Sequence, residues 1–79
     1  MAFYVEIKKT SEDSVYVVYK FTGDGGSSGE FKINKNSGEV TLIKKMEGIN
    51  SDKALQRATV KIRKEWKSGV LPDLTEWAS

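Results

Sequence analysis

An amphipathic helix between residues 51 and 68 is the feature that most constrains how this chain folds. Four apolar residues recur there at spacings of three and four, which places them on one stripe of a helical wheel. They are Leu55, Ala58, Ile62 and Trp66. Gly69 and Pro72 follow and favour a helix end, because glycine adopts the left-handed conformation and proline cannot continue a helix. The rest of the chain must supply a surface that buries this stripe.

Four shorter runs precede the helix, and their alternation and β-branched or aromatic content are typical of strands. They are Phe3–Lys9, Ser14–Thr22, Phe31–Asn34 and Glu39–Lys44. Four strands followed by one helix predict an α+β fold, with a four-stranded antiparallel meander covered on one face by the C-terminal helix. We expect a single small domain over residues 1–79, with the sheet in 3–44, the helix in 51–68 and a short tail in 70–79.

The register of the last two strands can be predicted. A four-residue loop over residues 35–38 places Ile33 opposite Val40 and Phe31 opposite Leu42, so that all four share one face. A loop of this length ends with a residue at positive φ, and Gly38 occupies that position. The first two strands pair across a turn at Thr10–Asp13.

The inward-facing residues of these elements form the predicted core. They are Phe3, Val5, Ile7, Val15, Val17, Tyr19, Phe21, Phe31, Ile33, Val40, Leu42, Leu55, Ala58, Ile62 and Trp66. Trp66 is expected to contribute most, and its removal to cost about 3–5 kcal/mol. The glycine-rich run at 23–29 predicts an exposed connection, since neither a Lys-Ser/Thr pair nor a helix follows it as in phosphate-binding loops.

Histidine and cysteine are absent from the sequence. This removes the usual general base at neutral pH, the Ser-His-Asp and Cys-His nucleophile systems, and the nitrogen and sulfur ligands of zinc. The carboxylates lie in polar surroundings that would not raise a pKa. We therefore expect no enzyme activity, no catalytic residue, no cofactor and no metal site.

The helix carries most of the positive charge. Residues 51–68 hold six basic and two acidic side chains, a net charge of +4, while the whole chain has +2 and the remainder therefore −2. One face is formed by Lys53, Arg57, Lys61 and Lys64. This face is either a solvated surface or a contact for phosphates or an acidic partner. Nucleic acid is thus a possible partner, although the modest net charge does not favour it.

The second face of the sheet has no predicted cover. It carries Tyr4, Tyr16, Val18 and Ile43 among charged residues, and apolar patches of this kind often mark an interface. We expect either an unknown protein partner or weak self-association there. The tail offers a competing cover, because Leu71, Leu74 and Trp77 could fold over this face or over the helix edge.

No apolar stretch approaches the roughly 20 residues that span a bilayer, and the N-terminus lacks the pattern of a signal peptide. With no cysteine present, the expected location is the cytoplasm, without a membrane partner.

The helix and tail contain the spacing Trp66-x-x-Gly69-x-x-Pro72 and a late Trp77, after a hairpin with F-x-I and S-G-E-V. In these features the chain resembles small uncharacterised bacterial proteins with a ββββα order. The resemblance implies the same fold and no known activity. The predicted function is a small non-catalytic protein-interaction or accessory module, with nucleic-acid binding through the basic helix face as the alternative.

Overall fold

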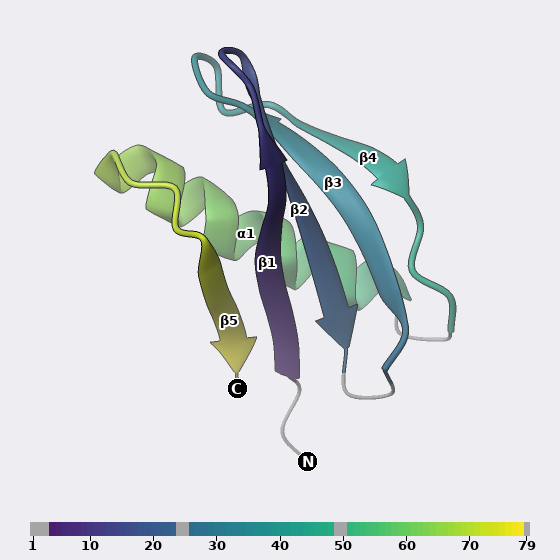
Figure 1. Cartoon of the computed structure of the whole chain (residues 1–79). Helices are drawn as coiled ribbons and strands as arrows, with labels where there is room; N and C mark the ends of the chain where they lie inside the picture. Colours follow the sequence, from purple (N-terminus) through teal and green to yellow (C-terminus); the bar gives the residue numbers. More distant parts are fainter. Residues whose placement is uncertain (1–3, 24–25, 49–50, 79) are drawn as a thin grey trace.

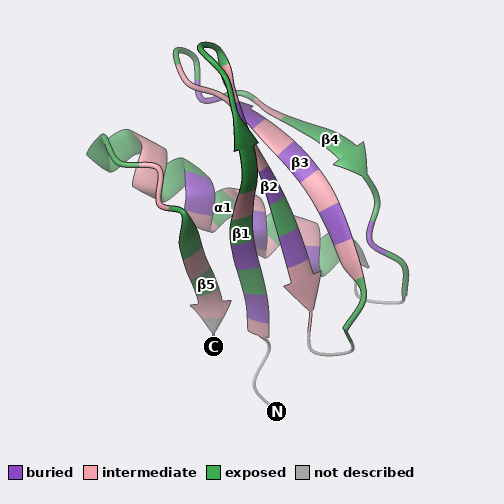
Figure 2. Cartoon of the chain, viewed as in Figure 1, coloured by how far each residue is buried: buried purple, intermediate pink, exposed green. Residues whose placement is uncertain are grey.

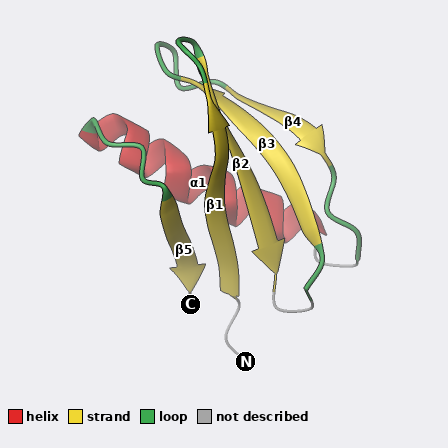
Figure 3. Ribbon diagram, viewed as in Figure 1, coloured by secondary structure: helices red, strands yellow, loops and turns green. Residues whose placement is uncertain are grey.

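The structure, a computed structural model, describes residues 4–23, 26–48 and 51–78. Its elements are β1 (Tyr4–Glu12), β2 (Tyr16–Gly23), β3 (Ser28–Asn34), β4 (Val40–Lys44), α1 (Ser51–Ser68) and β5 (Leu74–Ala78). The strands form one antiparallel sheet in the order β4-β3-β2-β1-β5, and α1 crosses one face of it (Figure 1). Figure 3 shows the two layers by element type. The predicted α+β fold is confirmed, and so is the helix at 51–68.

The tail differs from the prediction because it forms a fifth strand. β5 pairs antiparallel with β1, with Ile7 opposite Thr75 and Val5 opposite Trp77. Without it, β1 would have an unpaired edge of backbone N–H and C=O groups, and the tail satisfies those groups. The sequence left two positions open for the tail, over the outer face of the sheet or over the helix edge, and the structure does not show the first of them. The pairing with Val5 places Trp77 on the helix side.

The first hairpin is longer than predicted. β1 continues through the expected turn to Glu12, with a register shift between Lys9 and Ser11. The turn lies after it, where Oδ1 of Asp13 accepts hydrogen bonds from the backbone N–H groups of Val15 and Tyr16, each at 2.7 Å. Val15 consequently sits in the turn and is 39% exposed, so its assignment to the core is wrong.

The second hairpin has the predicted register, with Ile33 opposite Val40 and Phe31 opposite Leu42. Gly38 has a φ of 75°, as the loop requires. Trp66 lies directly against this glycine, since a Cβ on Gly38 would come within 2.6 Å of the indole ring. The indole N–H also donates to the backbone C=O of Lys35, at 2.8 Å. Trp66 thereby fixes the β3–β4 turn to α1.

The glycine-rich connection is shorter than predicted, because β2 includes Gly23 and β3 begins at Ser28. Residues 24 and 25 lie outside the described part. Gly29 is buried in β3, and a Cβ there would lie 2.6 Å from both the ring of Phe21 and the carbonyl oxygen of Lys44. Gly29 is therefore needed for close packing rather than for flexibility.

The core lies between α1 and the middle of the sheet (Figure 2). Its buried apolar residues are Val5, Ile7, Val17, Tyr19, Phe21, Phe31, Ile33, Met46, Ala54, Ala58 and Ile62. Met46 and Ala54 were not predicted, and Phe3 lies outside the described residues. Leu42 is 43% exposed, and Trp66, Val40 and Leu55 are only partly buried. Tyr19, Phe21 and Phe31 are the largest fully buried side chains, so Trp66 is not the centre of the core.

The helix ends as predicted. The backbone N–H of Gly69 donates to the C=O of Trp66 and that of Val70 to the C=O of Glu65, with Gly69 at a φ of 94°. This pair of bonds is the glycine-terminated helix cap known as the Schellman motif. Across the described ranges, no helix is long and apolar enough to cross a membrane.

Candidate protein-binding groove

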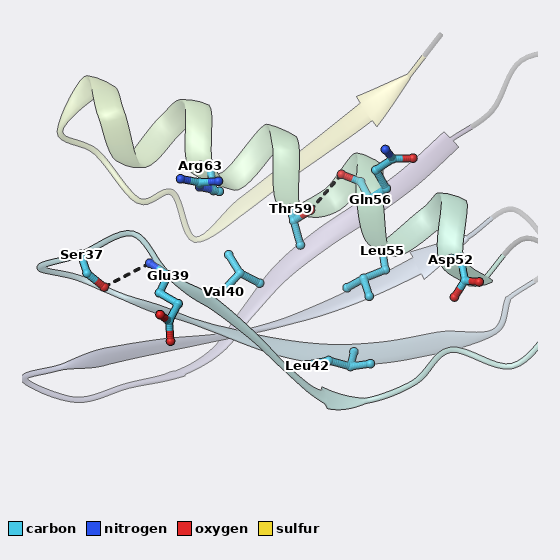
Figure 4. Close-up of a pocket in the computed structure, with 9 residues that line it drawn as sticks. All are labelled: Ser37, Glu39, Val40, Leu42, Asp52, Leu55, Gln56, Thr59 and Arg63. Carbon is cyan, nitrogen blue, oxygen red and sulfur yellow. Dashed lines mark hydrogen bonds between the residues drawn. The ribbon is translucent and has the colours of Figure 1, made fainter.

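The helix covers the sheet unevenly. Its close backbone neighbours are β1, β2 and β5. An α-helix is about 10–12 Å wide and neighbouring strands are about 4.8 Å apart, so one helix shields about two to three of the five strands. The part of the sheet near β4 is left open on the helix face, and a groove of about 710 Å³ lies there between α1 and β4 (Figure 4).

Apolar side chains lie between the two walls of this groove, and polar ones flank them. Val40 and Leu42 come from β4 and Leu55 from α1 (Figure 4). The flanking residues are Ser37, Glu39, Asp52, Gln56, Thr59 and Arg63. The helix residues among them recur at spacings of three and four and form a stripe next to the buried stripe of α1. Their side chains therefore reach the groove rather than the core.

The strand that borders the groove is an edge of the sheet. Leu42 is 43% exposed and Ile43 is 51% exposed. The backbone N–H of Asn34 donates to the C=O of Glu39 at 2.9 Å, and the C=O of Asn34 accepts from the N–H of Gly38. The ladder therefore begins with a hydrogen-bonded position at Asn34, and the next position, Ile33 opposite Val40, is a non-hydrogen-bonded pair. Hydrogen-bonded and non-hydrogen-bonded pairs alternate along an antiparallel ladder. Val40 and Leu42 therefore direct their backbone N–H and C=O groups away from β3, toward the open edge.

A second hollow of about 340 Å³ lies where the first hairpin meets the end of α1. Its wall includes Lys9, Glu12 and Lys35. The Glu12 carboxylate forms ion pairs with Lys35 and with Lys9, and Lys9 also reaches Asp73 at 3.0 Å. The positive and negative charges balance, so the hollow presents little net charge to a ligand. The ion pairs connect the hairpins to the start of β5.

The pKa values of this cluster follow from its contacts. Hydrogen bonds from Lys35 and then from Lys9 hold the pKa of Glu12 below its ordinary value. Hydrogen bonds to Glu12 and then to Asp73 raise the pKa of Lys9 to about 12. The hydroxyl group of Tyr19 donates to the C=O of Pro72 at 2.7 Å, and burial raises the pKa of Tyr19 to about 12.

The structure divides the predicted basic face of α1. Lys53 and Lys64 are exposed, as expected. Arg57 is partly buried, with its guanidinium carbon 4.9 Å from the centre of the Trp77 ring, and Lys61 forms an ion pair with Glu65 at 3.3 Å. Arg57 therefore covers β5, and the predicted phosphate contacts do not form one uniformly exposed surface.

The predicted outer-face residues do not form one patch either. Tyr16 and Val18 are close on β2, with Nζ of Lys32 4.2 Å from the centre of the Tyr16 ring. Tyr4 lies at the opposite end of the sheet. Lys8 of β1 lies opposite Lys20 of β2, and each tyrosine precedes the lysine of its own strand by four residues. Because the strands are antiparallel, Tyr4 and Tyr16 are eight residues apart along the strand direction. At about 3.3 Å per residue, that separation is about 26 Å. Ile43 lies on β4, apart from both tyrosines.

The sequence predicts the three apolar residues of the groove as core residues. Val40, Leu42 and Leu55 have the correct face and register, and the missing information was the position of α1 over the sheet. A usable signal did exist: a meander places its last strand at an edge, and one helix is too narrow to cover four strands.

Comparisons of the chain with protein families, with curated proteins and with solved structures found no match. The resemblance to small bacterial ββββα proteins stays a prediction.

Proposed function

We propose that this protein is a non-catalytic protein-interaction module, and that it binds an extended segment of a partner protein along β4. The observation that carries the proposal is the open edge of β4 beside an apolar groove. Binding would add one strand to the sheet.

The geometry supplies both parts of strand addition, in which backbone hydrogen bonds give affinity and pockets for alternate side chains give specificity. Val40 and Leu42 turn their backbone groups to the edge, and their side chains line the groove. Every second side chain of an added strand would lie on the same face as these two, and the one nearest Leu55 would contact it. The polar residues around the groove would then face the polar side chains of the bound segment.

The non-catalytic part of the proposal rests on composition. The chain has no histidine and no cysteine. Among the residues that the structure describes, the groups with a shifted pKa are Lys9, Glu12, Asp13 and Tyr19, and none of these four lines the groove. We propose the cytoplasm as the setting, since a cysteine-free module does not depend on an oxidising compartment.

The test is selection of short random peptides on the wild-type protein, followed by titration of the isotope-labelled protein with the selected peptides. We expect selected peptides to alternate apolar and polar residues and to shift the amide signals of β4 and of the groove side of α1. Leu42→Pro should abolish binding because it removes an edge N–H, whereas Leu42→Ala should only weaken it.

Val60→Ala is the matched control, since Val60 is an exposed apolar residue of the helix outside the groove. It should leave binding unchanged. Selected peptides that bind Leu42→Pro as tightly as wild type, or that shift only signals remote from β4, would contradict the proposed site.

Nucleic acid is the second candidate partner. Four basic residues of α1 are exposed and favour it: Lys53, Arg63, Lys64 and Lys67. Titration with short DNA and RNA at low salt should then shift helix signals and show a steep loss of affinity with added salt. Arg57 and Lys61 are engaged with Trp77 and Glu65, which is why we rank this candidate second.

A further inference from the structure

We propose that the segment bound along β4 is the β4 strand of a second copy of this chain. Two sheets of five strands would join edge to edge into one antiparallel sheet of ten. This inference rests on the proposed function, because it names the occupant of the same edge.

The backbone of β4 sets how two copies can pair. In its regular part, Val40 and Leu42 point their N–H and C=O groups to the open edge, as the Asn34–Glu39 bond requires. A two-fold axis that passes beside Thr41 places Val40 of each copy opposite Leu42 of the other. This register makes two hydrogen-bonded pairs between the copies. An axis beside Leu42 would make only one such pair within residues 40–42, the part of β4 that pairs regularly with β3.

The same register matches side chains. Val40 and Leu42 face the groove, so each valine would contact the leucine of the other copy on that face. An axis perpendicular to the sheet keeps both helices on the same face, and the two grooves therefore meet. Leu42, which is 43% exposed in one chain, would be covered by the second groove and its Leu55.

The charges of the strand ends are also complementary. Glu39 precedes the strand and Lys44 ends it, followed by Lys45. Antiparallel pairing brings the acidic end of each copy to the basic end of the other. A parallel arrangement would instead set like charges side by side, which is destabilising.

The dimer should dissociate readily. β4 has only five residues, and the register against β3 shifts at Glu30 and Phe31, so that Ile43 forms a bulge that limits the regular edge. A contact this short buries less than the roughly 1,200 Å² of stable complexes. We expect a dissociation constant above about 1 μM.

Sedimentation equilibrium of the full chain from micromolar to millimolar concentration is the first experiment. The mean mass should rise from the 8.8 kDa of one chain toward twice that value. Leu42→Pro should remain at the mass of one chain throughout, and Val60→Ala should behave as wild type. A wild-type mass that does not change over this range would overturn the inference.

A charge-swap experiment tests the orientation. Glu39→Lys leaves two basic ends, and the double variant Lys44→Glu/Lys45→Glu leaves two acidic ends, so each variant alone should dimerise at least tenfold more weakly than wild type. Mixed in equal amounts, the two variants should associate, because every acidic end then faces a basic one. Lys64→Glu is the matched control on the outside of α1 and should have no effect. Failure of the mixture to associate would exclude the antiparallel β4 pair.

The results separate this inference from the function on which it rests. A monomeric wild type that still binds selected peptides along β4 would refute the second copy and retain the interaction module. A dimer that survives Leu42→Pro would place the contact elsewhere on the molecule and also refute the inference.

Discussion

The two edges of the sheet are built differently. At the β5 edge, Trp77 lies on the helix side under the guanidinium group of Arg57. At the β4 edge, Leu42 and Ile43 are each 43% or more exposed and a groove separates the strand from α1. Both strands have five residues, so length does not explain the difference.

β5 is held by contacts that come from outside its own ladder. The Lys9 backbone N–H donates to the C=O of Asp73 at 2.8 Å, and the side chains of the same two residues form an ion pair. Tyr19 bonds to Pro72 just before the strand. On its outer face, the charge of Glu76 discourages the approach of a further strand, although Glu76 lies directly opposite Glu6 and this like-charge pair weakens the β1–β5 ladder. We call β5 the closed edge because its helix-side face is covered and its start is tied to Lys9 and Tyr19; it is an edge strand as β4 is, and its outer-face residue Leu74 is 61% exposed.

β4 is held mainly by its hairpin with β3 and by Trp66 on the turn. The two edges differ because one helix of limited width lies over only part of the sheet. It covers the half of the sheet formed by β1, β2 and β5 and leaves apolar residues of β4 partly exposed on the other half. Stability and recognition should then respond to substitutions in different strands.

The largest expected effect is on the covered half. Ile7 is fully buried, and Ile7→Ala should lower the free energy of unfolding by about 2–5 kcal/mol, because it removes core contacts and leaves a cavity. Leu42→Ala, at low protein concentration, should cost less than about 1 kcal/mol, because the leucine is half exposed. Urea unfolding followed by fluorescence measures both.

If Ile7→Ala does not fold, Ile7→Val gives the same comparison on a smaller scale, with a cost of about 0.5–1.5 kcal/mol. Equal costs for Ile7→Ala and Leu42→Ala in the monomer would show that β4 is as well packed as β1, and the contrast between the edges would be wrong.

The second prediction concerns the anchor of the open edge. Gly38→Ala should destabilise the protein by about 2–4 kcal/mol, because alanine is strained at positive φ and its methyl group would overlap the Trp66 ring. Gly69→Ala is the matched control, since Gly69 also has positive φ but has open space around its Cβ position. It should cost about 1 kcal/mol. Thermal or urea unfolding of both variants gives the difference, and a difference near zero would mean that Trp66 does not fix the turn.

The third prediction concerns the closed edge. Tyr19→Phe removes the hydrogen bond to Pro72 and should cost about 1 kcal/mol, without a cavity. Amide hydrogen exchange should accelerate in β5 while β4 changes little. Faster exchange spread evenly over both edges would show that Tyr19 acts through the core rather than on the tail.

The sequence predicted the parts of the fold that local rules decide. The β3–β4 register follows from the loop length and Gly38, and the helix from its apolar spacing and Gly69. β5 could not be predicted in this way, because its helix-side positions hold Thr75 and Trp77, which is not an alternating apolar pattern. Its existence depends on the unpaired edge of β1, which is a tertiary requirement.

The residues of the candidate site also depend on tertiary packing that local sequence rules do not predict. Leu42 has the pattern of a core residue, and only the placement of α1 leaves it exposed. Arg57 has the pattern of a solvated residue, and only the position of Trp77 draws it over β5. Periodicity says which face a residue occupies, but what covers that face is decided by elements far away in the sequence.

The smallest expected effect is the pH dependence of the ion cluster that supports the closed edge. The pKa of Glu12 is lowered from 4.5 by Lys35 and Lys9, and the pKa of Asp13 is lowered from 3.8 by the N–H groups of Tyr16 and Val15. A lowered carboxylate pKa means that the stabilisation is present above the ordinary value and is lost as the pH falls through the folded value. Stability should therefore decrease below about pH 4.5.

At high pH the sign is reversed. The pKa of Lys9 is raised from 10.5 to about 12 and that of Tyr19 from 10.0 to about 12, so their contributions are complete below pH 10 and are lost as the pH rises through 12. Urea midpoints measured from acid to alkaline pH should show a plateau with a fall on each side. Glu12→Gln should flatten the acid limb and accelerate hydrogen exchange at β5 more than at β4. An unchanged acid limb in Glu12→Gln would show that carboxylates elsewhere in the chain cause the fall, and that the ion cluster contributes little to closing the β5 edge.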